Sequence, residues 1–166
     1  MSTTARLTLE AADVAEAERI VARRPGRSDR WAEDFPFDGD VLAATMLLLQ
    51  SADHGDPAPF GHYVVRRRAD GLAVGGIGFK GPPVDGEVEI GYGLVPSARG
   101  HGFAAEAVAA VVGVAREQGL TRVVADTDLG NIASQRTLER AGFTETGREH
   151  GIVLYELVLT PEVIGP

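Results

Sequence analysis

The stretch from residue 87 to residue 106 constrains the fold more than any other part of the sequence. From Glu87 to Val95 it reads EVEIGYGLV. The even positions are bulky and apolar, while the odd positions from 87 to 93 hold two carboxylates and then two glycines. This pattern predicts a strand with one face in the core and the other face open. Glycines inside a strand commonly mark a close approach to the backbone, so the open face is interpreted as a groove. A face that is simply solvated would show the same alternation.

A loop that carries glycines follows this strand and opens a helix. It reads PSARGHGFAAE from Pro96 to Glu106. Free N–H groups at the start of a helix, together with the positive end of its dipole, bind anions, and small residues let a phosphate reach them. Arg99 adds a full positive charge. The loop from Arg99 to Ala104 is therefore predicted to hold a phosphate group.

The same loop also fits the dinucleotide pattern G-x-G-x-x-A over residues 100–105, with Asp126 at the end of the next strand. In a dinucleotide fold, however, the first glycine directly follows a buried parallel strand near the start of the unit. Here several residues intervene, and the preceding strand has a polar face. The dinucleotide interpretation is therefore disfavoured.

The whole chain is interpreted as a single α+β domain over residues 1–166, a length that suits one core. Short connections imply an antiparallel meander over residues 61–95, and the strand, helix and strand from 87 to 126 form the expected parallel crossover. Helices are expected over residues 13–22, 41–51, 102–118 and 132–141, and strands around 7–9, 61–68, 72–80, 87–95, 122–126, 143–146 and 152–159.

The connection over residues 23–40 is rich in Pro, Gly and charge, yet it contains Trp31, Phe35 and Phe37. Aromatic side chains are unusual in a plain solvated connector. Two interpretations stay open: a lid over a pocket, or a loop that its aromatic residues pin to the core.

Composition excludes several classes of function. A net charge of -8 opposes binding to nucleic acid, and the absence of cysteine excludes disulfides, thiolate metal sites and a cysteinyl acyl intermediate. No apolar run is long enough to span a bilayer, and the N-terminus lacks the layout of a secretory signal, so a cytoplasmic protein is expected. No metal site is expected either, because the four histidines lack ligand spacing. They are His54, His62, His101 and His150.

The segment from Glu87 to Phe143 resembles the GNAT superfamily of N-acetyltransferases, in particular its ribosomal-protein N-terminal acetyltransferase (RimJ/RimL-type) branch. The family signature R/Q-x-x-G-x-G/A is met by Arg99, Gly102 and Ala104. A second block, from Asn131 to Phe143, is similar to the helix that follows in the family. The resemblance implies a mixed, mostly antiparallel twisted sheet of six to seven strands, with about four helices and a central strand-loop-helix site for acyl-coenzyme A.

The resemblance also implies how acetyl-coenzyme A is held. The strand that ends at Val95 should diverge from strand 122–126, leaving a wedge for the pantetheine arm. Unpaired backbone groups of Leu94 and Val95 would bond the arm, and Asn131 would reach it, cap its own helix, or do both. The pyrophosphate would lie in the loop formed by Arg99, Gly100, His101, Gly102, Phe103 and Ala104.

Acyl transfer to an amine needs a proton acceptor and a stabilised oxyanion. The carboxylates Glu87 and Glu89 are the candidates for the acceptor, acting directly or through a water, and Glu89 is favoured because it is nearer the wedge. The oxyanion would be stabilised by the backbone N–H near Val95.

The acid that protonates the leaving thiolate has no direct counterpart. Many relatives carry a tyrosine seven residues after the asparagine, where this chain has Leu138. Ser134 is the substitute that the resemblance suggests, although it could equally be an ordinary serine in a first helical turn. Tyr92 and Tyr155 are further candidates, with Tyr92 expected in the core.

These residues predict an N-acetyltransferase that moves an acetyl group from acetyl-coenzyme A to a primary amine by direct attack through a tetrahedral intermediate. A non-catalytic sensor of acyl-coenzyme A with the same fold is the alternative. The acidic residues Asp34, Asp38 and Asp40 favour cationic acceptors such as protein N-termini, polyamines or aminoglycosides. A monomer or a homodimer is expected, with no nucleic-acid or membrane partner.

Overall fold

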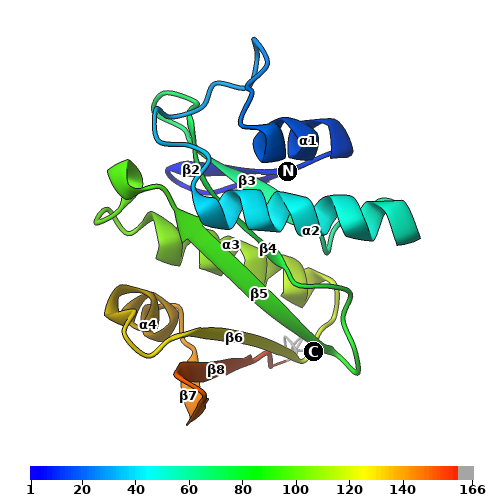
Figure 1. Cartoon of the computed structure of the whole chain (residues 1–166). Helices are drawn as coiled ribbons and strands as arrows, with labels where there is room; N and C mark the ends of the chain where they lie inside the picture. Colours follow the sequence, from blue (N-terminus) through cyan, green and yellow to red (C-terminus); the bar gives the residue numbers. More distant parts are fainter. Residues whose placement is uncertain (161–166) are drawn as a thin grey trace, which may run out of the picture.

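The computed structural model describes residues 1–160; the last six residues of the predicted domain lie outside the described part. Within it the chain forms a mixed sheet with helices on both faces (Figure 1). The strands are β1 (Ser2–Thr3), β2 (Leu7–Ala11), β3 (His62–Arg67), β4 (Ala73–Phe79), β5 (Glu87–Leu94), β6 (Arg122–Asp128), β7 (Thr144–Glu149) and β8 (Ile152–Val158). The helices are α1 (Val14–Ala22), α2 (Asp38–His54), α3 (Phe103–Glu117) and α4 (Ile132–Arg140), with a 3₁₀ turn η1 (Pro96–Ala98).

The eight strands lie in the order β1-β2-β3-β4-β5-β6-β8-β7. Over the described residues β5 and β6 pair in parallel, and the other neighbouring strands pair antiparallel. This confirms the predicted α+β class and the mostly antiparallel sheet. The strand count exceeds the expected six to seven because the two-residue β1 pairs with β2.

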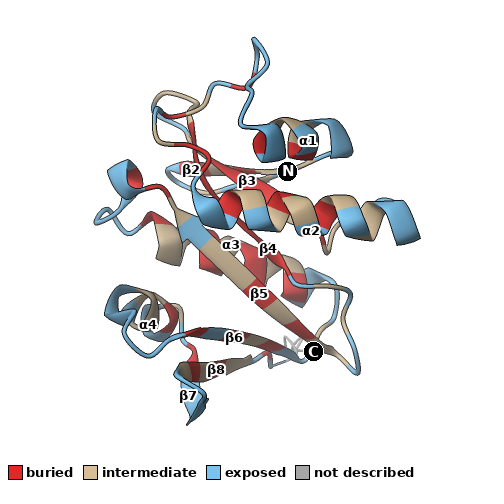
Figure 2. Cartoon of the chain, viewed as in Figure 1, coloured by how far each residue is buried: buried red, intermediate tan, exposed pale blue. Residues whose placement is uncertain are grey.

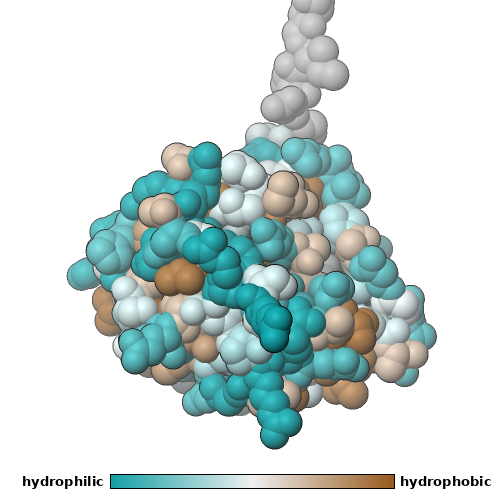
Figure 3. Space-filling model, turned by 90° about the horizontal axis from the view of Figure 1, so that it is seen from above, coloured by the Kyte–Doolittle hydropathy of each residue, from teal (hydrophilic) through white to brown (hydrophobic). Residues whose placement is uncertain are grey.

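Helices α1 and α2 pack against each other on one face of the sheet, while α3 covers the other face beside α4 (Figure 1). Strand β4 lies between these layers and is buried along its whole length (Figure 2). The core is built from aliphatic side chains of the inner strands and from the inner stripe of α3. On the face seen in Figure 3, hydrophilic side chains predominate and apolar ones are scattered.

Most expected boundaries agree with the structure to within one to three residues. The difference that affects the site is the start of α2. It was expected to begin at Val41 but begins at Asp38, because the Asp40 carboxylate accepts the Phe37 N–H at 2.9 Å and so starts the helix earlier. The residues 38–40 therefore belong to the first turn of α2 rather than to the preceding loop. This shift brings Asp40 over the sheet.

The remaining loop before α2 is pinned to the core, which is the second of the two interpretations. Phe35 is buried and meets the ring of Trp31 edge-on at 5.2 Å, and the Ala32 N–H donates to the Ala73 carbonyl at 3.1 Å. The loop also contacts the predicted phosphate loop, since the Asp34 carboxylate accepts both the N–H and the hydroxyl of Ser97.

The sheet splits at its parallel pair. Glu87–Glu89 of β5 pair with Arg122–Val124 of β6, but beyond these residues β5 stays with β4 and β6 stays with β8. The two strands consequently separate toward the C-terminal end of β5 (Figure 1). The predicted divergence of these strands is confirmed.

Candidate functional site

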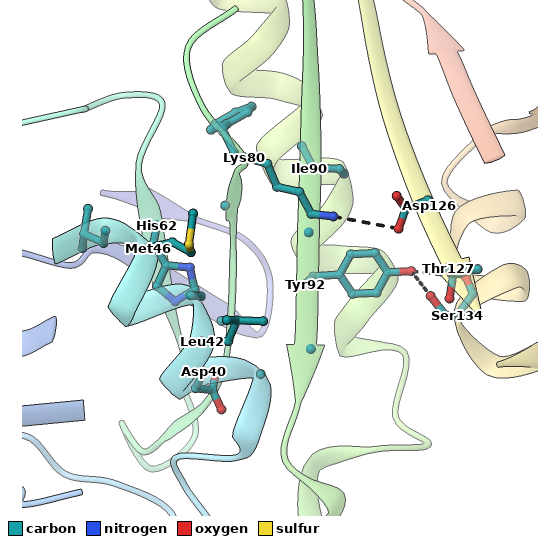
Figure 4. A pocket seen from close by; sticks show the side chains of 18 of the residues that line it. Asp40, Leu42, Met46, His62, Lys80, Ile90, Tyr92, Asp126, Thr127 and Ser134 are labelled. Atoms are coloured by element: carbon teal, nitrogen blue, oxygen red, sulfur yellow. Dashed lines mark hydrogen bonds and ion pairs between the residues drawn. The ribbon is translucent and has the colours of Figure 1, made fainter. Parts of the chain in front are cut away.

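A cavity of about 520 Å³ lies between α2 and the sheet and reaches the gap between β5 and β6. Its floor is made of glycines, whose missing side chains leave space between the helix and the strands. Figure 4 shows its two sides, one lined by α2 and β3 and the other by β6 and α4. The lining residues are Gly39, Asp40, Leu42, Ala43, Met46, Leu47, Gln50, His62, Gly76, Gly78, Phe79, Lys80, Ile90, Gly91, Tyr92, Gly93, Asp126, Thr127, Asn131 and Ser134.

The β4–β5 register decides which backbone groups face the gap. The Val95 N–H donates to the Val74 carbonyl at 2.9 Å, and Gly76 pairs with Gly93. Because alternate residues of an antiparallel strand bond the same neighbour, the backbone groups of Tyr92 and Leu94 turn away from β4 toward the gap.

The expectation that Val95 offers unpaired backbone groups is wrong. Its N–H is used by Val74, and its carbonyl accepts the Ala98 N–H at 3.0 Å, because Val95 occupies a hydrogen-bonded position of the ladder and also starts the η1 turn. The Val95 N–H is therefore not free for an oxyanion. Leu94 is available in part, since its carbonyl accepts a bond from Arg99 Nε at 3.0 Å.

The predicted phosphate loop, from Arg99 to Ala104, has a backbone that suits its glycines. Gly100 and Gly102 have φ of +82° and +78°, values that favour glycine, and Gly102 directly precedes the first turn of α3. The Phe103 ring is buried in the core. The backbone N–H groups of Phe103 and Ala104, at the start of α3, have no partner within the helix and can donate to an anion. The ring of His101 lies 5.6 Å from that of Phe103.

Two arginines flank this loop, and sequence reasoning found one of them. Arg99 lies over the ring of Phe37 at 5.2 Å. The missed residue is Arg6, which donates to the His101 carbonyl at 2.7 Å and pairs with Glu106 at 3.0 Å. No motif connects Arg6 to the loop, because the sheet alone brings the start of the chain to it.

Ser134 is joined to a tyrosine, although the tyrosine is not the one found in relatives. Tyr92 Oη lies 2.8 Å from Ser134 Oγ, and both residues line the cavity (Figure 4). Tyr92 is half-buried rather than a core residue as expected, because the separation of β6 opens space beside it. Burial raises the pKa of Tyr92, so the hydroxyl keeps its proton at neutral pH.

The other candidates around α4 take structural positions. The Asn131 side chain accepts the Ser134 N–H at 3.1 Å, which confirms the helix cap, and Asn131 also lines the cavity. Leu138 is fully buried. Tyr155 is buried with its hydroxyl 3.5 Å from Glu139, and it is not among the described residues that line the cavity.

The two predicted proton acceptors lie at the end of β5 where β5 and β6 are still paired. Glu87 forms an ion pair with Arg122, and Glu89 pairs with Lys80 at 3.1 Å. Lys80 Nζ also lies 3.9 Å from the Asp126 carboxylate (Figure 4). Among the described residues that line the cavity, Lys80 and Asp126 are present and the two glutamates are not. The structure does not bring these glutamates together with Ser134.

The cavity also brings together Asp40, which the sequence connected only with a cationic acceptor, and His62, to which the sequence assigned no role. Both approach the position that a Cβ on Gly76 would take, His62 Nε2 to 2.6 Å and Asp40 Oδ1 to 3.1 Å. Burial raises the pKa of Asp40 to about 6 and lowers the pKa of His62 to about 4. A histidine opposite a glycine-rich strand is a signal for such a site, but it can be read only once the pairing of β3 with β4 is known.

Two features are absent from residues 1–160. None of the helices there combines the length and the apolar character that crossing a membrane requires. No cluster of three or more histidine, aspartate or glutamate side chains there is arranged to hold a metal ion.

Comparison with known proteins identifies the family. Residues 6–144 match the family model described as an acetyltransferase (GNAT) domain. The chain is also 33% identical over 137 residues to the uncharacterized N-acetyltransferase YjdG of Bacillus subtilis (strain 168), a match that covers 81% of this chain and 79% of that protein. The predicted family is confirmed.

Solved structures share the fold. RimL, a ribosomal L7/L12 α-N-protein acetyltransferase in complex with coenzyme A, is 17% identical with a TM-score of 0.68, and the match covers 96% of this chain and 97% of that one. The ribosomal-protein-S5-alanine acetyltransferase from Vibrio fischeri is 16% identical with a TM-score of 0.68, over 100% of both chains. These neighbours agree with the predicted branch at the level of the fold.

Proposed function

The chain belongs to the GNAT acetyltransferase family and is an acyltransferase, and from this premise we propose that it transfers the acetyl group of acetyl-coenzyme A to a primary amine. The observation that carries the proposal is the separation of β5 from β6 beside a loop suited to phosphate. Together these two features leave room for a long thioester whose arm is joined to a pyrophosphate. The neighbour RimL, which was solved with coenzyme A, supports this choice of co-substrate.

The pyrophosphate would be held by the loop from Arg99 to Ala104. Its acceptor oxygens would meet the backbone N–H groups of the loop and of the first turn of α3, aided by the helix dipole. Arg99 supplies a positive charge next to this backbone, whereas the charge of Arg6 is balanced by Glu106. The residues proposed to hold the pyrophosphate are Arg99, Gly100, His101, Gly102, Phe103 and Ala104.

The pantetheine arm would enter the gap between β5 and β6. Its amides would bond the backbone of Tyr92 and Leu94, which points into the gap, and Asn131 can contribute its amide N–H₂ because its oxygen caps α4. Val95, with both backbone groups already bonded, would line the end of the arm without donating to it.

In the proposed reaction the amine nitrogen attacks the thioester carbonyl carbon, and a C–N bond forms. The oxyanion of the tetrahedral intermediate would accept the N–H of Tyr92 or Leu94, which take over the role first expected of Val95. Collapse of the intermediate breaks the C–S bond and releases the thiolate of coenzyme A.

The thiolate would take its proton from the pair formed by Ser134 and Tyr92. The two oxygens are 2.8 Å apart, so a proton given by Ser134 Oγ can be replaced from Tyr92 Oη without a change of position. The raised pKa of Tyr92 suits a donor, because the hydroxyl arrives protonated at neutral pH. This pair would fill the position left open by Leu138.

The incoming ammonium must also lose a proton, and there are two places for the acceptor. The sequence favours Glu89 over Glu87, acting directly or through a water, but the Glu89 carboxylate is paired with Lys80 and that of Glu87 with Arg122. Asp40 instead faces the cavity from α2.

Thiol release from acetyl-coenzyme A in the presence of primary amines tests the proposed function. We expect release that depends on the amine, with Arg99→Ala weakening coenzyme A binding about tenfold through loss of a charge-assisted bond. Arg116→Ala is the matched control: it removes an arginine from the last turn of α3, at the opposite end of that helix from the loop, and coenzyme A should bind normally. Calorimetric binding of the thioester without release for any amine would instead indicate the non-catalytic sensor.

The names of the neighbours suggest protein N-termini as acceptors, and small-molecule amines fit the same chemistry. A cytoplasmic location and a monomeric or homodimeric state stay predictions. Sedimentation at several protein concentrations would distinguish the two oligomeric states.

A further inference from the structure

One end of the cavity lies directly beside the backbone proposed to hold the thioester. Gly93 stands between Tyr92 and Leu94 on β5 and pairs with Gly76 of β4. Both glycines line the cavity, and over Gly76, on the α2 side of the sheet, lie the side chains of Asp40 and His62. A Cβ on Gly76 would come within 2.6 Å of the imidazole, so glycine there is what allows His62 to take this position.

The Asp40 carboxylate has no cation. It is 6% exposed and accepts the Phe37 N–H, but among residues 1–160 no lysine or arginine lies within 4.0 Å of it. The charge of Arg23 lowers the pKa of Asp40 less than burial raises it, and Arg23 is itself paired with Asp38 and bonded to the Pro36 carbonyl.

The other elements packed against Asp40 bring no positive charge to it. From β3 comes His62, which is neutral at neutral pH because burial lowers its pKa to about 4. From β4 and β5 come glycines, and Lys80 pairs with Glu89 near the paired end of β5. From the phosphate loop, Arg99 lies over the ring of Phe37 and bonds the Leu94 carbonyl. The buried Asp40 carboxyl, with a pKa of about 6, is thus mostly ionised at neutral pH, and no cation of the protein balances its charge.

Of the three acidic residues that the sequence placed near this region, Asp40 alone faces the cavity. Asp34 is bonded to Ser97, and Asp38 is 92% exposed and paired with Arg23. The cavity can therefore match one positive charge at this end rather than the several charges of a polyamine or an aminoglycoside.

The wall around Asp40 is apolar. Leu42 and Met46 of α2 line the cavity while staying 65% and 52% exposed, so their side chains are free to be covered by a ligand (Figure 4). Leu47 and Phe79 complete this wall. A group that enters beside Asp40 would gain hydrophobic contact along α2.

From these observations we propose that Asp40, His62 and the apolar wall of α2 form the acceptor site for a primary amine whose ammonium is attached to a hydrophobic group. The proposal rests on the proposed acetyltransferase function and names its substrate class. An N-terminal residue with a large apolar side chain and an arylalkylamine both carry this chemistry.

The proton balance follows from the same groups. The ammonium of the acceptor pairs with the Asp40 carboxylate, which then takes one of its protons, and the neutral imidazole accepts a hydrogen bond from the amine. The freed nitrogen lone pair forms the C–N bond, the C–S bond breaks, and the thiolate takes a proton from the Ser134 and Tyr92 pair. The acylated nitrogen then loses its second proton, which returns through solvent to that pair. Asp40 returns its proton to solvent after the product leaves. A carboxyl group whose pKa burial raises to about 6 suits this task.

The first test compares acceptors with the full-length protein and acetyl-coenzyme A. The probes are 2-phenylethylamine against ethanolamine, and peptides with N-terminal leucine against peptides with N-terminal serine. We expect the apolar member of each pair to have a kcat/KM about tenfold higher. Met46→Ala should reduce this preference, while Leu49→Ala, an exposed residue of α2 outside the described cavity lining, should keep it.

The second test removes the charge. Asp40→Asn should lower kcat/KM for the amine by about 100-fold and leave calorimetric binding of acetyl-coenzyme A unchanged. Asp38→Asn, two residues earlier on the same helix, is the control and should behave like the wild type. Asp40→Glu, which keeps the charge, should restore part of the activity.

The outcomes separate the two proposals. If the wild type transfers acetyl groups to no amine, the proposed function fails. If it does transfer them, but Asp40→Asn matches Asp38→Asn in amine KM and kcat, or the polar acceptors are preferred, then the acceptor site is elsewhere. Thermal unfolding of each variant confirms that the protein compared is folded.

Discussion

Two buried aspartates of similar exposure, Asp29 at 4% and Asp40 at 6%, have opposite surroundings. Asp29 receives two hydrogen bonds from Arg19, at 2.7 and 2.8 Å, and one from the Gly26 N–H at 2.6 Å. The hydrogen bonds from Arg19, and then that from Gly26, hold its pKa below the usual range. Asp40 accepts one backbone N–H, and burial raises its pKa to about 6.

The difference separates a group that the fold satisfies from one that it leaves for a ligand. The carboxylate of Asp29 joins α1 to the loop that follows, and its charge is balanced within the protein. The carboxylate of Asp40 opens onto a cavity next to the proposed thioester site. Burying a charge without a partner costs free energy, and a cost of this kind at a cavity wall is typical of a functional residue.

The largest change in stability is expected when the ion pair between Asp29 and Arg19 is broken. Asp29→Asn should lower the free energy of unfolding by about 3 kcal/mol, because Arg19 and the Gly26 N–H lose their ionised partner. Urea denaturation near neutral pH measures this, with Asp38→Asn as an exposed control. A loss below about 1 kcal/mol would mean that Asp29 is no better satisfied than a surface residue.

Asp40→Asn should instead raise the free energy of unfolding. At pH 8 we expect the variant to be more stable by at most about 3 kcal/mol, the value of a shift from 3.8 to about 6. Asparagine can still accept the Phe37 N–H, so the start of α2 is kept. The same substitution is expected to impair acetyl transfer, which would make Asp40 a site where stability is lost for function.

The pH window follows from the sign of that shift. A carboxyl group with a raised pKa in the folded state stabilises the protein below about pH 4, and this contribution is lost as the pH rises to about 6. The advantage of Asp40→Asn should thus be absent at pH 4 and complete above pH 6. Urea titrations of both proteins across this range check it; an advantage that does not change with pH would contradict the assigned pKa.

Tyr92→Phe gives a smaller effect and tests the other side of the cavity. Removing the hydroxyl should reduce kcat about tenfold, with the amine KM unchanged, because the bond to Ser134 serves the leaving group rather than the acceptor. Ser134→Ala should act similarly, and the double variant should lose less than the product of the two. An additive loss would show that the two hydroxyls act separately.

Glu89→Gln should have the smallest effect. Its carboxylate is paired with Lys80 in a partly exposed position, as Asp29 is paired with Arg19, so it belongs with the groups that the fold satisfies. We expect a change in stability below about 1 kcal/mol and kcat/KM within about threefold of the wild type. A loss as large as that of Asp40→Asn would return the proton acceptor to Glu89.

Local pattern was sufficient for much of this protein. The alternation along Glu87–Leu94 and the glycines before Phe103 identified the strand, the loop after it and the start of α3, because each depends on residues close together in the chain. Asn131 was correctly read as a possible helix cap for the same reason. Periodicity also predicted the helices and the meander.

The site depended on contacts between distant segments. Whether the Val95 N–H is free, and whether Tyr92 lies in the core, are decided by the β4–β5 register and by where β6 separates. Arg6 reaches the phosphate loop only because β2 lies in the same sheet. None of these distances is encoded in local spacing.

The sequence by itself therefore determined the main elements, their order, the glycine loop before α3 and the family, since these follow from hydrophobic period and from a contiguous motif. Only the tertiary structure decided which polar groups meet in the cavity. Asp40 and Asp29 are the same type of residue. What distinguishes them is that folding places Arg19 beside Asp29 and places Asp40 at a cavity wall. The pKa of a buried carboxylate is set by burial and by that partner, which no local pattern can specify.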